Sequence, residues 1–206
     1  MTIRAVVFDL DGVLCRHEDS GVSCRWEARC GLPEGGLRRL FSEGPIARRS
    51  LMGKATIEEA YAEFWVEVQR RFSLTSDELE AWRDEARQAS MERKWDDELL
   101  AFIQALRPGV RTGLISNAWV GTREKVKEHI HSRTFDVILF SAEEGVAKPD
   151  AEIYRRALSR LGVAAEEVIF VDDWPPNLES ARAIGIHALR FTGSLAVREE
   201  INRLMQ

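Results

Sequence analysis

The chain alternates short apolar runs with longer segments in which apolar residues recur at helical spacing. The apolar runs are rich in Val, Ile, Leu and Phe and comprise residues 5–8, 112–115, 137–140, 168–171 and 187–191. Runs of this length between turn or charged residues are typical of strands that are buried on both faces of a sheet. We therefore predict one buried strand for each run.

The segments between the later runs predict helices. Ile153, Ala157 and Leu161, for example, recur at helical spacing between the third and fourth predicted strands. Alternating strands and helices form a mostly parallel sheet with helices on both faces, and ligands bind at the carboxyl ends of its strands. The pattern thus predicts an α/β fold with a three-layer core.

Residues 15–95 break this alternation, because their pattern is helical and contains no convincing strand. Their clearest helix carries one apolar stripe, made of Ile57, Ala60, Tyr61, Phe64, Trp65, Val68 and Phe72. Thr56 and Glu59 form a capping box ahead of this helix, and Thr75 and Glu78 form another ahead of the next. We predict a helical cap over residues 15–95, inserted into an α/β core made of residues 1–14 and 96–206.

Composition narrows the class of protein. Of the 206 residues, 45% are hydrophobic and 31% are charged, which is ordinary for a globular chain. The net charge of -5 argues against a general nucleic-acid binder, since such proteins need a basic surface. The three cysteines include no C-x-x-C pair, so neither a zinc site nor a disulfide framework is expected.

The chain carries no recognisable targeting or membrane signal. Its N-terminus enters the first apolar run directly, without the basic start, long apolar stretch and cleavage site of a signal peptide. No apolar run approaches the ~18 residues that span a bilayer. We expect a cytoplasmic protein that binds neither a membrane nor nucleic acid.

Two carboxylates follow the first predicted strand, in the stretch FDLDGV. Alternate side chains of a strand point the same way and Gly12 lets the chain turn, so Asp9 and Asp11 can converge on one cavity. Such a pair suits a nucleophile and an acid–base partner. The alternative is an ordinary acidic turn after a strand.

Two further strand ends carry groups that suit a phosphate. Ser116 and Asn117 follow the second strand, where a hydroxyl and successive backbone N–H groups can receive phosphate oxygens. Lys148 follows the third strand, and Pro149 holds its ammonium in an extended segment. The alternatives are a turn or helix-capping serine and a solvated surface lysine.

Asp172 and Asp173 follow the fourth strand, in the stretch VDDWPPN. Two acidic clusters at two strand ends repel each other across a shared cleft unless a cation lies between them. A hard divalent ion with oxygen ligands, Mg²⁺, is the economical explanation. The alternative is that one of these aspartates caps the following helix.

Together these motifs resemble the haloacid dehalogenase superfamily, in its phosphatase branch with a helical cap. The matching residues are Asp9 and Asp11 in FDLDGV, Ser116 in LISNA, Lys148 in AKPD, and Asp172 and Asp173 in VDDWPPN. They occur in the family's order over nearly the whole chain. The stretch 53–65, the VDD…N pattern and the overall size are also similar to small sugar-phosphate phosphatases and to the N-terminal domain of soluble epoxide hydrolases.

The resemblance implies a Rossmann-like core with strand order 3-2-1-4-5 and a phosphatase mechanism. Asp9 would attack phosphorus and form an aspartyl phosphate, while Asp11 would protonate the leaving alcohol and then activate water. Mg²⁺ would be held by the Asp9 carboxylate, the Asp11 backbone carbonyl and the Asp173 carboxylate. Asp172 would support the site without direct metal contact, or bind the metal through water.

The same resemblance implies roles for the remaining site residues. Ser116 and the backbone N–H of Asn117 would bind the transferring phosphoryl group, and Lys148 would offset the charge on Asp9 and phosphate. Asn177 would order the loop that carries the two aspartates. Two other functions stay open, a metal-independent 2-haloacid dehalogenase and a non-catalytic binding or regulatory protein. The acidic Asp11 disfavours the dehalogenase, and the full set of catalytic residues disfavours the binding protein.

Specificity is expected to lie in the cap, with a small phosphorylated metabolite as the substrate. The cap contains six basic residues that either reach a substrate's distal charge or form solvated faces: Arg25, Arg38, Arg39, Arg48, Arg49 and Lys54. The amphipathic cap is compatible with a monomer and with a homodimer through its apolar face.

Overall fold

The predicted strands form one parallel five-stranded sheet. The computed structural model describes residues 2–17, 21–89 and 93–206. The sheet consists of β1 (Ala5–Phe8), β4 (Arg111–Ser116), β5 (Val137–Phe140), β6 (Val168–Asp172) and β7 (His187–Arg190). The spatial order is β5-β4-β1-β6-β7, which is 3-2-1-4-5 when these strands are counted along the chain. The predicted fold class and strand order are therefore confirmed.

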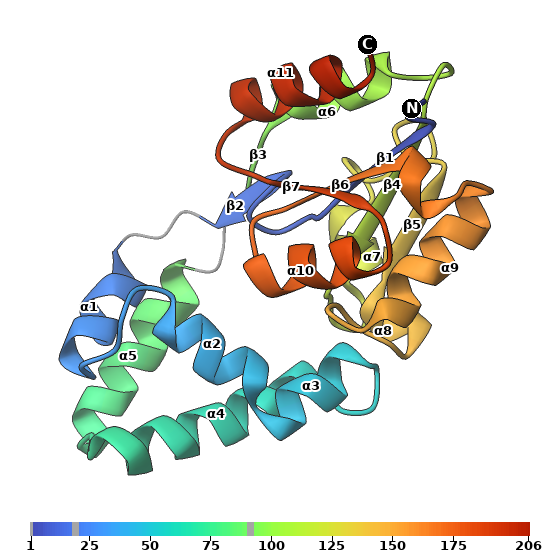
Figure 1. Cartoon of the computed structure of the whole chain (residues 1–206). Helices are drawn as coiled ribbons and strands as arrows, with labels where there is room; N and C mark the ends of the chain where they lie inside the picture. The colour runs from blue at the N-terminus through green and yellow to red at the C-terminus, as the bar shows by residue number, and fades with distance from the viewer. Residues whose placement is uncertain (1, 18–20, 90–92) are drawn as a thin grey trace.

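Side chains of β1 alternate between two hydrophobic clusters, one on each face of the sheet, as the two-residue period of a strand requires. Val6 and Phe8 belong to one cluster, and Ala5 and Val7 belong to the other. The first face packs against α6 (Asp97–Ala105), α7 (Thr122–Val126) and α11 (Ser194–Leu204). The second face packs against α9 (Ala151–Leu161) and α10 (Pro175–Ala183). The core thus has three layers (Figure 1).

Residues 21–89 form a separate group of helices beside the core (Figure 1). They are α1 (Val22–Arg29), α2 (Gly36–Glu43), α3 (Pro45–Leu51), α4 (Ile57–Phe72) and α5 (Ser76–Ala89). Their own hydrophobic cluster includes Trp82, whose ring stacks on Trp26 at 4.7 Å between centroids. Both predicted capping boxes are present, at Thr56 with Glu59 and at Thr75 with Glu78.

The prediction that residues 15–95 contain no strand is wrong. β2 (Cys15–His17) and β3 (Arg93–Trp95) pair as a short antiparallel ribbon, with Cys15 opposite Trp95. Strands of three residues are too short to show an alternating pattern, and their partners are far apart in sequence. The ribbon lies where the chain leaves the core and where it returns, so it brings the two ends of the cap side by side.

Two short elements complete the core: α8 (Ser141–Glu144) after β5, and the 3₁₀ helix η1 (Ala165–Glu167) before β6. The cap approaches the core closely at α8. A Cβ on Gly53 would lie 2.5 Å from the carbonyl oxygen of Ala142. Across the described parts of the chain, no helix is long and apolar enough to cross a bilayer.

Candidate active site

The carboxyl ends of three neighbouring strands place polar side chains together. Phe8 of β1 pairs with Leu114 of β4 and with Val171 of β6. Asp9 and Asp172 come directly after Phe8 and Val171, and Ser116 is the last residue of β4, so all three lie at one edge of the sheet, since parallel strands end on the same side. All three side chains are buried. The site is therefore built from residues far apart in sequence.

Lys148 bridges two of the buried carboxylates. Its Nζ lies 2.7 Å from Asp9 Oδ1 and 2.6 Å from Asp172 Oδ2, with the ammonium side chain 1% exposed. Burial raises the pKa of Asp9 to about 8, although the Lys148 ammonium opposes this shift. Burial alone would lower the pKa of Lys148, but Asp172 and Asp9 outweigh that effect and raise it. Lys148 therefore stays charged and favours ionised Asp9.

The side chain of Asn117 holds the backbone of Lys148. Its Nδ2 donates to the Lys148 carbonyl at 2.8 Å, and the Lys148 N–H donates to its Oδ1 at 2.8 Å. This reciprocal pair ties the loop after β4 to the lysine loop. The sequence assigned a phosphate-binding role to the Asn117 backbone and missed this use of its side chain.

Asp172 has both of its carboxylate oxygens engaged. Oδ1 accepts from the Trp174 N–H at 2.7 Å, and Oδ2 accepts from Lys148 and from Asn177 Nδ2, the latter at 2.9 Å. Asn177 is itself held, because the Tyr154 hydroxyl donates to its carbonyl at 2.9 Å. Asn177 therefore orders the aspartate loop, and the engaged Asp172 is less available to a metal than its neighbour.

Asp173 offers a free ligand atom toward the same cluster. Its Oδ1 is buried and has no hydrogen-bond partner among the described residues. Asp9, Asp172 and Asp173 each present a carboxylate oxygen within 4.8 Å of the others. Gly12, at φ +94°, lets the nucleophile loop pack against Asp173, since a Cβ there would lie 2.5 Å from Asp173 Oδ2. This oxygen-only set fits Mg²⁺.

Asp11 lies on the same loop and lines the same cavity as Asp9. Its Oδ1 lies 3.4 Å from Arg93 Nη2 and 3.4 Å from Cys15 Sγ. The sequence did not predict that a residue of the short strand β3 would reach this carboxylate. No sequence pattern pointed to Arg93 as a site residue, because it lies in an interval whose apolar spacing predicts helices.

The cavity over these strand ends has a volume of about 640 Å³ and includes Ser116, Asn117 and Lys148 in its lining. The cap supplies the opposite wall. Its contributions include Arg38, Phe41, Arg48, Leu51 and Met52. The structure therefore brings the predicted core residues together beneath the cap, with both charged and apolar side chains facing them.

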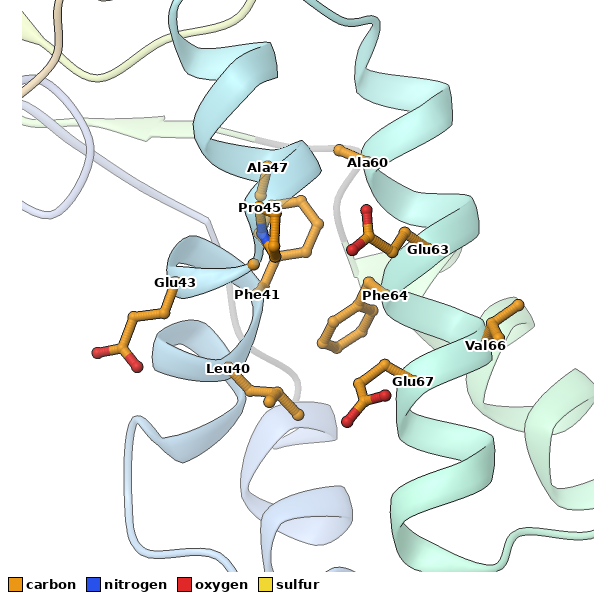
Figure 2. Close-up of a pocket in the computed structure, with 11 residues that line it drawn as sticks. Leu40, Phe41, Glu43, Pro45, Ala47, Ala60, Glu63, Phe64, Val66 and Glu67 are labelled. Atoms are coloured by element: carbon orange, nitrogen blue, oxygen red, sulfur yellow. The ribbon is translucent and has the colours of Figure 1, made fainter.

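A second cavity of about 350 Å³ lies within the cap, between α2 and α3 on one side and α4 on the other (Figure 2). Its lining includes the apolar residues Leu40, Phe41, Pro45, Ala47, Ala60 and Phe64. Phe41 lines both cavities. Its ring packs edge-on against that of Trp119 in the core, with 5.7 Å between the ring centroids. The aromatic ring of Phe41 therefore lies between the two spaces.

Comparison with known proteins decides the family. A family model described as haloacid dehalogenase-like hydrolase matches residues 3–185. The chain belongs to the haloacid dehalogenase-like hydrolases. Relatives of this hydrolase include a phosphatase of Mycobacterium tuberculosis, which is 28% identical over 98% of this chain and 94% of its own length.

Other relatives are longer proteins. The rat bifunctional epoxide hydrolase 2 is 27% identical over 99% of this chain, which spans 39% of that protein. A mouse acyl-CoA dehydrogenase family member 10 is 26% identical over 98% of this chain, which spans 19% of that protein. The matched segment is thus one part of these larger relatives.

Solved structures show the same fold. A predicted HAD-like hydrolase from Porphyromonas gingivalis has a TM-score of 0.67 and 25% identity, and covers 100% of this chain and 99% of its own. A Bacteroides thetaiotaomicron HAD enzyme in complex with magnesium and inorganic phosphate has a TM-score of 0.61 and 21% identity, covering 91% and 93%. A Pseudomonas syringae 2-haloacid dehalogenase has a TM-score of 0.56 and 21% identity, covering 92% and 86%. The hydrolase fold is thus shared by phosphate-binding and dehalogenating proteins.

Proposed function

We propose that this hydrolase is a magnesium-dependent phosphatase that cleaves a small phosphorylated metabolite through an aspartyl phosphate on Asp9. The observation that carries the proposal is the set of carboxylates on Asp9, Asp172 and Asp173, within 4.8 Å of one another. Asp11 lines the cavity beside them. A phosphate monoester and its divalent ion together match such a site.

Asp9 supplies the nucleophile. Its Oδ1 accepts hydrogen bonds from the Leu10 N–H and from Lys148, both at 2.7 Å, so the carboxylate is held in one orientation. An Asp9 oxygen forms a bond to phosphorus while the bond from phosphorus to the leaving alcohol oxygen breaks. Lys148 stabilises the ionised carboxylate and the negative charge of the phosphoryl group.

Asp11 supplies the acid–base group. It donates a proton to the leaving alcohol in the first step, then takes a proton from the water that hydrolyses the aspartyl phosphate. The first step leaves Asp11 ionised and the second returns its proton, so the residue ends the cycle in the state in which it began. Its carboxylate is partly exposed and lies 3.4 Å from Arg93 Nη2. Ser116 and the Asn117 backbone N–H hold the phosphoryl oxygens.

Asp9, Asp173 and the backbone carbonyl of Asp11 would hold Mg²⁺. When bound, the ion offsets the charge on the phosphoryl group and orients it toward Asp9. Asp172 supports this arrangement through Lys148 and Asn177 rather than through a direct bond.

The cavity supports a small substrate. Its volume of about 640 Å³ suits one small ligand. The phosphatase-named relative from Mycobacterium tuberculosis supports a phosphorylated substrate. A monomer and a homodimer are both compatible with the proposal, and no nucleic acid or membrane is needed as a partner.

A 2-haloacid dehalogenase is the second candidate, because the Pseudomonas syringae dehalogenase shares the fold. Dehalogenation would use the same aspartate on carbon and would need neither Asp11 nor a metal. Asp11 favours the phosphatase, as does Asp173 Oδ1, which has no hydrogen-bond partner within residues 2–17, 21–89 and 93–206. The two activities therefore differ in their need for metal.

Hydrolysis of p-nitrophenyl phosphate by the purified protein tests the proposal. We expect turnover with Mg²⁺, none with EDTA, and a loss of at least about a thousandfold in Asp9→Asn, because the nucleophile is removed. Asp97→Asn, an exposed aspartate of α6, is the matched control and should retain full turnover. Circular dichroism would establish that both variants are folded.

The competing outcome is equally clear. If the wild-type protein released halide from 2-haloacids in the presence of EDTA and did not hydrolyse phosphate monoesters, the dehalogenase assignment would replace this one. A panel of phosphorylated metabolites would then be unnecessary. Turnover of p-nitrophenyl phosphate would instead justify that panel as the next step.

A further inference from the structure

An arginine of the cap reaches the candidate metal site. Arg38, in α2, has its Nη1 2.8 Å from Asp173 Oδ2. Its guanidinium also lies over the ring of Trp174, 5.1 Å from the centroid. A single cap side chain therefore contacts both residues that follow Asp172. Arg39 shares the contact with Trp174, but in the described part of the cap the ion pair with Asp173 belongs to Arg38.

Asp173 takes part in two interactions, one with Arg38 and one with the candidate metal site. Its Oδ2 accepts from Arg38, whereas its Oδ1 is buried without a hydrogen-bond partner in the described part of the chain. The same carboxylate belongs to the cluster that lies within 4.8 Å of Asp9 and Asp172. One carboxylate is thus the ion-pair partner of the cap and a candidate ligand of the cation.

The charges at the site make the binding of Arg38 and the binding of a divalent cation oppose each other. Three carboxylates face one another, and Lys148 already lies between Asp9 and Asp172. Arg38 adds a second positive charge at Asp173, close to where a divalent cation would bind. Like charges repel, so each cation weakens the binding of the other, by an amount that the 53% exposure of the Arg38 side chain keeps moderate.

We infer that Arg38 is a positioning residue that competes with the divalent cation for Asp173, so that metal binding releases the guanidinium into the catalytic cavity that it lines. Coupling of this kind is reciprocal: the Arg38–Asp173 contact weakens metal binding to the same degree that the metal weakens the contact. The inference rests on the metal site of the proposed function.

The position of Arg38 in α2 makes this coupling relevant to the cap. Phe41 lies one helical turn after Arg38 and lines both cavities. Loss of the Arg38–Asp173 contact therefore frees the helix that carries this ring from its ion pair with the core. Metal binding would loosen α2 in the absence of substrate.

Calorimetric titration of the metal-free protein with MgCl₂ tests the inference without relying on turnover. We expect Arg38→Gln to bind Mg²⁺ about tenfold more tightly than wild type, within the range usual for coupled sites. Arg38→Lys keeps the charge and should restore an affinity close to that of wild type. Arg39→Gln is the matched control, since Arg39 is exposed and lies over the same ring at 5.9 Å. Its affinity should be unchanged.

Hydrogen–deuterium exchange supplies a second readout. Peptides that cover Gly36–Glu43 should exchange faster when Mg²⁺ is added to the wild-type protein. In Arg38→Gln the same peptides should show no change on addition of Mg²⁺, because the contact is already absent. Exchange in β1 serves as the internal reference.

Distinct results separate the failure of this inference from that of the proposed function. Weaker or unchanged Mg²⁺ binding in a folded Arg38→Gln, beside normal binding in wild type, would mean that Arg38 orients Asp173 rather than competes for it. That result overturns the inference and leaves the phosphatase assignment intact. Absence of Mg²⁺ binding in wild type would overturn both.

Discussion

The core and the cap present charge to the shared cavity in opposite ways. In the core, Lys148 is 1% exposed and contacts two carboxylates that are at most 8% exposed. In the cap, Arg38 is 53% exposed and reaches Asp173 from a separate group of helices. Burial strengthens the electrostatic attraction between Lys148 and its two carboxylates and fixes their geometry. Solvent weakens the ion pair between Arg38 and Asp173. The rigid core cluster is thus suited to catalysis, and the more exposed contact of the cap is suited to forming and breaking.

Removal of Lys148 is expected to have the largest effect. Lys148→Met leaves Asp9 and Asp172 buried without their cation. The free energy of unfolding should therefore fall by about 3–5 kcal/mol. Turnover should fall by at least about a hundredfold, because the charge on the phosphoryl group is no longer offset. Urea denaturation and steady-state kinetics measure the two effects. Exposed Lys125→Met in α7 is the control, and equal behaviour of the two variants would contradict the importance assigned to the buried Lys148 cluster.

A methyl group at Gly12 tests how closely the nucleophile loop must approach Asp173. Gly12→Ala should lower Mg²⁺ affinity at least about tenfold, since the added Cβ would lie 2.5 Å from Asp173 Oδ2. Gly145→Ala provides the comparison, because Gly145 also has a positive φ, but no atom of the described residues beyond its chain neighbours lies within 4 Å of an added Cβ. It should cost only about 1–2 kcal/mol of stability. Calorimetry on both variants decides whether crowding or backbone strain is responsible.

Truncation of Phe41 tests the cap side of the comparison. Phe41→Ala should join the two cavities, because this ring lines both and contacts Tyr61, Phe64 and Trp119. We expect the ratio of kcat/KM for naphthyl phosphate over phenyl phosphate to rise about tenfold, as pocket volume usually discriminates on this scale. Phe41→Leu should change the ratio less. An unaltered ratio in Phe41→Ala would exclude Phe41 as a boundary of the substrate space.

The smallest effect concerns the thiol below the nucleophile loop. Burial, reinforced by Asp11, raises the pKa of Cys15 well above its usual range. A raised thiol pKa means less thiolate at pH 8, so Cys15 should react slowly with Ellman's reagent. Exposed Cys24 should react fast, and Cys24→Ser should remove that fast phase. Rapid modification of Cys15 in the native protein would show that this part of the core opens readily.

Several features of the core followed from the sequence because they are local. The apolar runs predicted each strand, since a strand buried on both faces needs continuous apolar residues. The motif positions predicted which residues meet, since Asp9, Ser116 and Asp172 each stand at the end of a parallel strand. The capping boxes of the cap were equally readable, because both partners lie within one helical turn.

Contacts between segments that are distant in sequence could not be predicted in this way. The ribbon of β2 and β3 was missed because its strands have three residues each. The reach of Arg93 to Asp11 depends on that ribbon, and the reach of Arg38 to Asp173 depends on how the cap lies beside the core. The reciprocal hydrogen bonds of Asn117 with Lys148 likewise join two loops that are far apart in sequence.

The sequence by itself determined the fold class, the strand order expected from the family resemblance and the residues at the strand ends. Periodicity and chain order are enough for the fold class and the strand ends, because they reflect burial and parallel pairing, whereas the strand order came from the family resemblance. Only the tertiary structure decided that Asp172 accepts hydrogen bonds on both oxygens while, among the described residues, Asp173 has one oxygen without a partner and an arginine on the other. The two aspartates are adjacent and chemically identical, so their difference arises entirely from the side chains that packing brings to each.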